Sequence, residues 1–296
     1  MAIKTTGDIA DAFAAGRWHV QLFFKNTQAN ALDGTWYDWS YASGQPAYDS
    51  RIGVALTRTP FVAAGNDAIW FPAISKGQER RLAGLTFITA TTGSGQLNVE
   101  AWLYDLVAVY PLIDGDSTDA QDMVNTAPLP RYTDGAGLRA VIVNHVAPQI
   151  QAVTSGCNLT YTDADGVQRT TGFGLQNNGV NRACSRIPGS ATGASADIYM
   201  NLTAPRGVRS IDSLTFGTAP GGLWAIYLVK PIAFVSHRSG TDIQNSPVMT
   251  ESCFCIERSF DLPLIPDGAA LGFFTLGNVN TRTVSSIYGT ARFIWG

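Results

Sequence analysis

Apolar positions along the chain gather in short segments, each bounded by Gly, Pro, Asn or Asp. Several segments carry the β-branched and aromatic residues that favour strands. No long stretch between them repeats apolar residues with the 3.6-residue period of a helix, so crossover helices and a parallel sheet are disfavoured. The pattern therefore predicts an all-β, antiparallel protein. The predicted strand segments include 67–74, 82–92, 97–113, 137–146, 197–202, 223–236 and 271–277.

One segment near the N-terminus has the helical pattern instead. In 6–16 ("TGDIADAFAAG"), Ile9, Ala12 and Phe13 share one face of a helix. Thr6 is the predicted N-cap, and Gly16 is suited to end the helix. We expect a short helix here.

A turn motif occurs twice. "LPRYTDGAGL" at 129–138 and "LPLIPDGAAL" at 262–271 share Leu-Pro, Asp-Gly-Ala and a final Leu, 133 positions apart. Other pairs follow in the same order with drifting offsets, as expected when a duplicated gene gains and loses loop residues. These pairs are 44–52 with 179–187, 85–90 with 214–219, 107–113 with 227–234 and 157–162 with 289–295.

The repeat predicts two similar β domains. A period of about 130 residues is far longer than that of solenoid repeats, so each copy is expected to form a domain. About eight short strands per copy suit a jelly roll, in which two sheets cover each other's apolar faces. The predicted organisation is an N-terminal arm with the short helix (1–35), sandwich unit A (36–166) and sandwich unit B (167–296).

Each copy of the motif contains an Asp-Gly pair, Asp134-Gly135 or Asp267-Gly268. This pair is typical of a tight turn, because Gly adopts the positive φ that other residues resist. The four residues are therefore predicted structural turns of the repeat. A calcium or sugar site at the aspartate is the alternative.

Charge excludes some partners. The formal net charge is −3, and Lys and Arg are interspersed, so the chain lacks the basic stripe that binds phosphates. We expect no nucleic acid. The first 18 residues lack the apolar core of a signal peptide, and no later apolar run is long enough to span a bilayer, so we expect no membrane association and no secretion.

The sequence offers little catalytic chemistry. Its three histidines, His19, His145 and His237, lack metal-ligand spacing, and neither a nucleophile elbow nor a phosphate-binding loop is present. The acidic segment 112–122 lacks the spacing of an EF-hand and is interpreted as a surface loop. We expect no enzyme activity, no metal and no cofactor, although carboxylates that meet only in space leave a glycosidase open.

Aromatic residues cluster in "GTWYDWSYASG" at 34–44. Trp36 and Trp39 are candidates for an interface or a glycan contact. The competing interpretation is packing in the core or against another subunit. Both interpretations can hold in part, because Trp36 and Trp39 fall on opposite faces of a strand.

Several of these segments together resemble virion structural proteins of tailed bacteriophages. The resemblance covers most of the chain and lies in "WYDWS" (36–40), "GQPAYDSR" (44–51), "VYPLID" (109–114), "LPRYTDGAGLRAVIV" (129–143) and "ARFIWG" (291–296). It implies similarity to capsid decoration or cement proteins with jelly-roll folds, and it carries over no catalytic residue.

The expected function is therefore a capsid decoration protein that is assembled in the host cytoplasm, binds the phage major capsid protein or other virion proteins and stabilises the shell. A homotrimer is favoured, because a trimer of a duplicated domain presents six similar units around one axis. Three alternatives stay open: a receptor-binding or glycan-binding protein at the tail or a vertex, a small double-jelly-roll major capsid protein, and an enzyme acting on cell-wall sugar.

Overall fold

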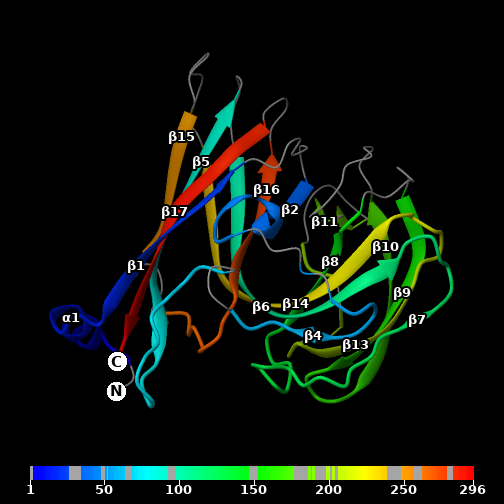
Figure 1. Ribbon diagram of the computed structural model, residues 1–296, viewed down its shortest axis with the longest axis horizontal. Helices are drawn as coiled ribbons and strands as arrows, with labels where there is room; N and C mark the ends of the chain where they lie inside the picture. The colour runs from blue at the N-terminus through cyan, green and yellow to red at the C-terminus, as the bar shows by residue number, and fades with distance from the viewer. Residues whose placement is uncertain are drawn as a thin grey trace.

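The computed structural model describes most of the chain and shows one short helix beside extensive antiparallel sheet (Figure 1). This confirms the predicted all-β fold with antiparallel, jelly-roll-like sandwiches. The described residues are 3–26, 35–47, 51, 53–63, 68–92, 98–146, 153–176, 186–187, 189–190, 198–200, 202–203, 206–238, 248–255, 262–278 and 283–296.

The centre of the molecule is a barrel. The strand order β14-β8-β11-β2-β16-β6 closes on itself because β14 also pairs with β6, and β4 is appended to β6. The two long strands, β6 and β14, pair along almost their whole length. The barrel strands and β4 are β2 (Thr35–Asp38), β4 (Thr59–Pro60), β6 (Asn98–Asp114), β8 (Arg139–Asn144), β11 (Arg186–Ile187), β14 (Leu223–Arg238) and β16 (Leu271–Asn278).

Two five-stranded sheets flank the barrel. The first outer sheet has the order β15-β5-β17-β1-β3, and the second has the order β12-β10-β9-β13-β7. The first consists of β1 (Trp18–Asn26), β3 (Gly44–Gln45), β5 (Arg80–Thr92), β15 (Val248–Cys255) and β17 (Thr283–Trp295). The second consists of β7 (Gln121–Asp122), β9 (Val153–Asp163), β10 (Gln168–Gln176), β12 (Gly189–Ser190) and β13 (Val208–Thr215).

Three apolar cores hold these layers together. One fills the barrel, where Tyr104 stacks on Phe274 at 3.9 Å between ring centroids. The other two lie between the barrel wall and each outer sheet, so the barrel wall is apolar on both faces. β6 and β14 contribute to all three cores, which explains why "LVAVYPLI" and "AIYLVKPIA" read as nearly continuous apolar runs.

The topology repeats within the chain. Taken in chain order and without β4, the strands β1–β9 correspond one to one to β10–β17, so that β1 corresponds to β10 and β9 to β17. This correspondence converts the strand order of the first outer sheet into that of the second, read in reverse, and it maps the barrel onto itself. Core residues match as well. Leu85 and Phe87 face the first sandwich core, and Leu214 and Phe216 occupy the same positions in the second.

Strand pairing supports three of the sequence matches. Leu85 pairs with Ala291, and their counterparts Leu214 and Leu159 also pair. The motif copies 129–138 and 262–271 precede the counterpart strands β8 and β16. Two other matches are out of register. By topology, the counterpart of β3 (44–45) is β12 (189–190), which lies outside the sequence match at 179–187. The first residues of the counterpart strands β6 and β14 are 125 positions apart, whereas the sequence match pairs 107 with 227, which are 120 apart.

The sheets exchange strands between the two copies. In the first outer sheet, β5 lies between β15 and β17, which come from the second copy. The predicted unit boundary at 166/167 falls in the turn between β9 and β10. β1, placed by sequence in the arm 1–35, is instead the counterpart of β10 and belongs to the repeat. The two units are therefore intertwined, because each supplies strands that complete the sandwich of the other.

The helix α1 (Thr6–Ala14) forms where the sequence predicts it. Its N-cap is Thr5 rather than Thr6: the Thr5 hydroxyl accepts the Asp8 N–H, and the Asp8 carboxylate accepts the Thr5 N–H, completing a capping box. Gly16 follows the helix with φ of 68°. The helix packs its Phe13 side against Ile294 of β17.

Candidate functional site

The predicted turn residues lie at the start of β8 and β16. Gly135 has φ of 82° and Gly268 has φ of 71°, the left-handed region that Gly tolerates. The two aspartates differ, however. Asp134 accepts a hydrogen bond from Ala136 N at 3.0 Å, whereas Asp267 forms an ion pair with Arg80 at 3.1 Å. The duplicated turn therefore has one copy with an additional, buried partner.

Trp36 and Trp39 both lie in the interior of the protein. Trp36 points into the barrel, and Trp39 packs in the first sandwich core, where its Nε1 donates to Thr275 Oγ1 at 2.6 Å. Trp39 belongs to a short 3-10 helix (Trp39–Tyr41) that follows β2. Both indoles are buried, so neither offers a stacking surface to a glycan in this fold.

A buried polar network lies in the same region. Arg51 Nη1 donates to Asp38 at 2.6 Å and to Tyr104 Oη at 2.8 Å, and Tyr104 in turn donates to Asp38 at 2.7 Å. The Arg51 guanidinium lies 5.1 Å from the ring centroid of Tyr227. Burial raises the pKa of Tyr104 well above its ordinary value. These groups interact with one another within the barrel and are shielded from solvent, so we interpret the network as structural.

The exposed candidate site is the outer face of the first outer sheet. Side chains on this face of β1 are Trp18, Val20, Leu22 and Phe24. Leu22 is 69% exposed and Trp18 is 46% exposed, so this face presents large apolar side chains to solvent. Phe24 packs on Tyr288 of β17 at 4.8 Å between ring centroids. These five residues form a continuous strip that we call the apolar outer face.

The equivalent face of the second outer sheet is polar. The register Phe23↔Gly289 in the first sheet corresponds to Phe173↔Cys157 in the second, which equates β1 with β10 position by position. Trp18, Val20 and Leu22 thereby correspond to Gln168, Thr170 and Gly172. Thr160 and Thr170 share a hydrogen bond of 3.1 Å on that face, and Gln168 donates to Asp212 at 3.2 Å.

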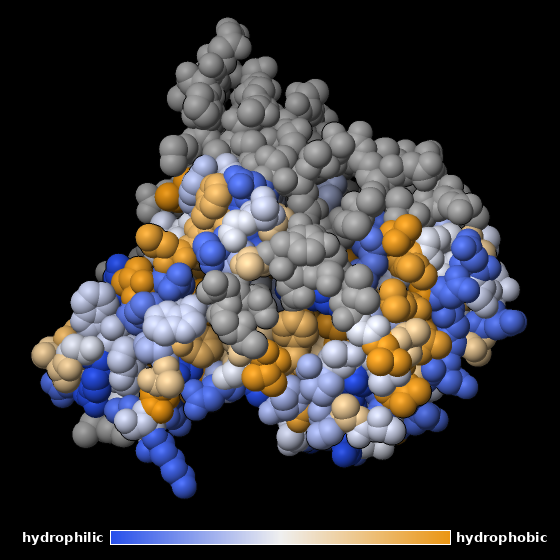
Figure 2. Space-filling view, viewed as in Figure 1, coloured by the Kyte–Doolittle hydropathy of each residue, from blue (hydrophilic) through white to orange (hydrophobic). Residues whose placement is uncertain are grey.

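The duplication thus supplies an internal comparison. The same strand positions carry apolar side chains on one sheet and two hydrogen-bonded polar side chains and a glycine on the other, so the fold itself does not require the apolar outer face. Figure 2 shows hydrophobic side chains along β1 at the left of the molecule. In the sequence, the alternation of "WHVQLFFKN" (18–26) indicates a strand with two different faces, although the predicted organisation assigns these residues to the N-terminal arm.

Metal-ligand clusters and long apolar helices were sought among the described residues. Across them, no group of three or more His, Cys, Asp or Glu is positioned to hold an ion. The helix that they contain is too short to cross a bilayer. The acidic residues Asp116 and Asp119 are exposed, as the surface-loop interpretation expects.

Comparisons with known proteins identify only distant similarity. No family model and no curated protein match the chain. Among solved structures, the chain is similar to that of infectious bursal disease virus, Gt strain, with 9% sequence identity and a TM-score of 0.19. The alignment covers 94% of this chain and 80% of the viral chain. Derived T=1 particles of the same virus align at 10% identity, 94% and 77% coverage and a TM-score of 0.18. Such TM-scores assign no fold, and the architecture rests on the strand pairings described above.

Proposed function

We propose that the chain is a non-enzymatic structural protein of a phage virion, a decoration or cement protein that binds the assembled shell through the apolar outer face. The observation that carries the proposal is the contrast between this face and its polar counterpart on the second outer sheet. An apolar strip that the fold does not require is typical of a surface buried by a partner.

The sequence resemblance to tailed-phage virion proteins supplies the partner class. In this proposal, the partner is the phage major capsid protein or another virion protein, and the protein resides in the virion. Binding to the assembled lattice rather than to free shell subunits stabilises the shell by linkage, because the bound state gains the binding free energy.

The proposed oligomer is a trimer. Each chain contains two topologically equivalent sandwiches, so three chains around an axis present six similar units. A trimer of this kind matches the symmetry of a sixfold capsomer. Sedimentation velocity of the purified protein tests this part of the proposal independently of capsid binding, and a monomer or dimer would contradict it.

The decisive experiment adds purified protein to capsids that lack it. We expect co-sedimentation with the capsids and a higher temperature of DNA release. A failure of the wild-type protein to bind capsids would overturn the decoration role. The number of copies bound per particle separates the roles further, because hundreds indicate the shell, whereas a few dozen or fewer indicate the tail or a vertex.

A matched pair of substitutions tests the surface. Leu22→Asp places a charge on the apolar outer face, while Thr170→Asp places one on the polar face of the equivalent strand. We expect Leu22→Asp to weaken capsid binding at least about tenfold, because it removes a buried leucine from the interface. Thr170→Asp should bind like the wild type. Equal binding by both variants would show that another surface is used, and thermal unfolding checks that both are folded.

A further inference from the structure

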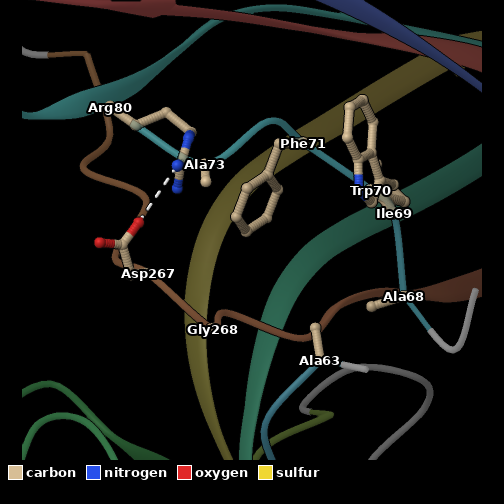
Figure 3. Close-up of a pocket in the computed structure, with 9 residues that line it drawn as sticks. All are labelled: Ala63, Ala68, Ile69, Trp70, Phe71, Ala73, Arg80, Asp267 and Gly268. Atoms are coloured by element: carbon tan, nitrogen blue, oxygen red, sulfur yellow. Dashed lines mark hydrogen bonds and ion pairs between the residues drawn. The ribbon is translucent and has the colours of Figure 1, made fainter. Parts of the chain in front are cut away.

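A pocket of about 460 Å³ lies beside the second copy of the repeated turn. Its size falls in the range of about 300–1,000 Å³ that is common for small-molecule sites. Figure 3 shows Arg80 and Asp267 on one side, Phe71 in the middle and Trp70 on the other side. The rest of the lining is apolar and consists of Ala63, Ala68, Ile69, Ala73 and Gly268.

The polar side of the pocket is a fixed ion pair. The Arg80 guanidinium is buried, lies 4.2 Å from the ring centroid of Phe71, and donates through Nη2 to Pro72 O at 2.7 Å and to Asp267 Oδ1 at 3.1 Å. The Asp267 side chain is 76% exposed. A carboxylate has four acceptor positions, so Asp267 retains acceptors that face solvent after binding Arg80.

The apolar side of the pocket is an exposed indole. Trp70 is 50% exposed, although the neighbouring Ile69 is buried. The His19 ring contacts Trp70 in a T-shaped arrangement with 4.9 Å between ring centroids, which restrains the indole. A restrained, half-exposed aromatic ring can bind a ligand with little loss of side-chain entropy.

We propose that this pocket binds a sugar residue of a glycan, with the ring of the sugar against Trp70 and its hydroxyl groups donating to Asp267. A sugar ring combines an apolar C–H face with several O–H donors, and the pocket offers one aromatic surface and one acceptor group to match them. A neutral ligand is favoured over an ion because the Arg80 charge already compensates that of Asp267.

The first copy of the turn shows that this arrangement is not inherent in the repeat. Its aspartate, Asp134, is exposed and accepts from the backbone of Ala136. Arg209, which stands at the position of Arg80 in the repeat, is exposed. The buried arginine beside the Asp267 turn is therefore a feature of one copy and not a requirement of the turn.

The test is ligand-observed saturation-transfer NMR on the purified protein with D-glucose, D-galactose, L-rhamnose and N-acetyl-D-glucosamine. Affinities then follow from titration of the indole N–H signals of the labelled protein. We expect at least one sugar to bind. Trp70→Ala should weaken that binding at least about tenfold, and Trp70→Phe should restore part of it.

Two matched controls make the result specific. Trp18→Ala removes a similarly exposed indole from the apolar outer face, and Asp134→Asn alters the equivalent turn; both should bind the sugar like the wild type. Asp267→Asn should weaken binding, with thermal unfolding confirming that the variant is folded. Absence of binding by all four sugars, or undiminished binding by Trp70→Ala, would overturn the proposal. Neither outcome affects the capsid-binding test, which uses a different surface.

Discussion

Asp105 and Arg131 form a buried, bidentate ion pair that joins the two copies of the repeated turn motif. Arg131 Nε lies 2.9 Å from Asp105 Oδ2, and Arg131 Nη2 lies 2.7 Å from Asp105 Oδ1. Arg131 belongs to the first copy of the motif, at 129–138. The same carboxylate accepts the N–H of Ala270, in the second copy, at 2.8 Å. One side chain on β6 therefore anchors both turns.

Removing this carboxylate should be strongly destabilising. Asp105→Ala leaves the Arg131 charge buried without its partner, which costs about 3–5 kcal/mol in comparable buried pairs. Urea unfolding measures the change, and Asp116→Ala, at an exposed aspartate, is the control with an expected change within about 0.5 kcal/mol. A loss below about 1 kcal/mol for Asp105→Ala would show that the pair does not anchor the turns.

The two turn glycines should respond differently to the same substitution. A Cβ at Gly135 would lie 2.5 Å from Arg209 Cα, whereas a Cβ at Gly268 would lie 2.9 Å from Val62 Cγ1, on an exposed side chain that can move. Both substitutions incur about 1 kcal/mol or more for the positive φ. Gly135→Ala adds a backbone clash of about 1–3 kcal/mol.

Urea midpoints at constant m-value compare the two glycine variants directly. We expect Gly135→Ala to be the less stable by at least about 1 kcal/mol. The reverse order would mean that the first turn relaxes more easily than its backbone packing indicates.

His145 should make the protein less stable in mild acid. Burial lowers the pKa of His145 to about 4 from its ordinary 6.5, and its Nε2 lies 3.2 Å from Tyr227 Oη. The unfolded chain binds the proton first, so the free energy of unfolding falls as the pH falls from about 6.5 toward 4, by up to about 3 kcal/mol.

Urea unfolding at pH 7 and pH 4.5 isolates this contribution when the wild type is compared with His145→Gln. The variant lacks the titrating ring, so its stability should decline less between the two pH values. An identical decline in both proteins would assign the acid sensitivity to other groups.

The capping box of α1 should contribute measurably to stability. Thr5→Ala removes the hydroxyl that accepts the Asp8 N–H, with an expected loss of about 1 kcal/mol. Thr6→Ala, one position later and exposed, is the matched control and should cause no loss. Thermal unfolding of the two variants checks the assignment. A greater loss of stability for Thr6→Ala would identify Thr6 as the N-cap, as the sequence predicts.

Local chemistry made several features predictable from sequence. The Asp-Gly pairs predicted tight turns because few residues other than Gly adopt positive φ, and both glycines do so. The matches at 85–90 and 157–162 predicted equivalent core strands, because buried positions resist change. The helix was also predictable, although its cap was displaced by one residue, since Thr5 and Thr6 have the same side chain.

The candidate sites depended on pairings that no local pattern reveals. Arg80 lies beside Asp267, in the pocket that Trp70 also lines, only because the segment before β16 folds next to the start of β5. The alternation in 18–26 shows that two faces differ, but it does not show which face is covered by the barrel. Phe23 is buried there, while its neighbour Leu22 is exposed.

The sequence by itself therefore determined the β class and predicted the duplication and the turns, because each depends on residues close together along the chain or on similarity between its halves. Tertiary structure alone decided that the two copies exchange strands, that Trp36 and Trp39 are interior, and that one outer sheet presents an apolar face. The physical reason is that antiparallel strands can pair with several partners of similar pattern, and the burial of all three cores at once selects among them.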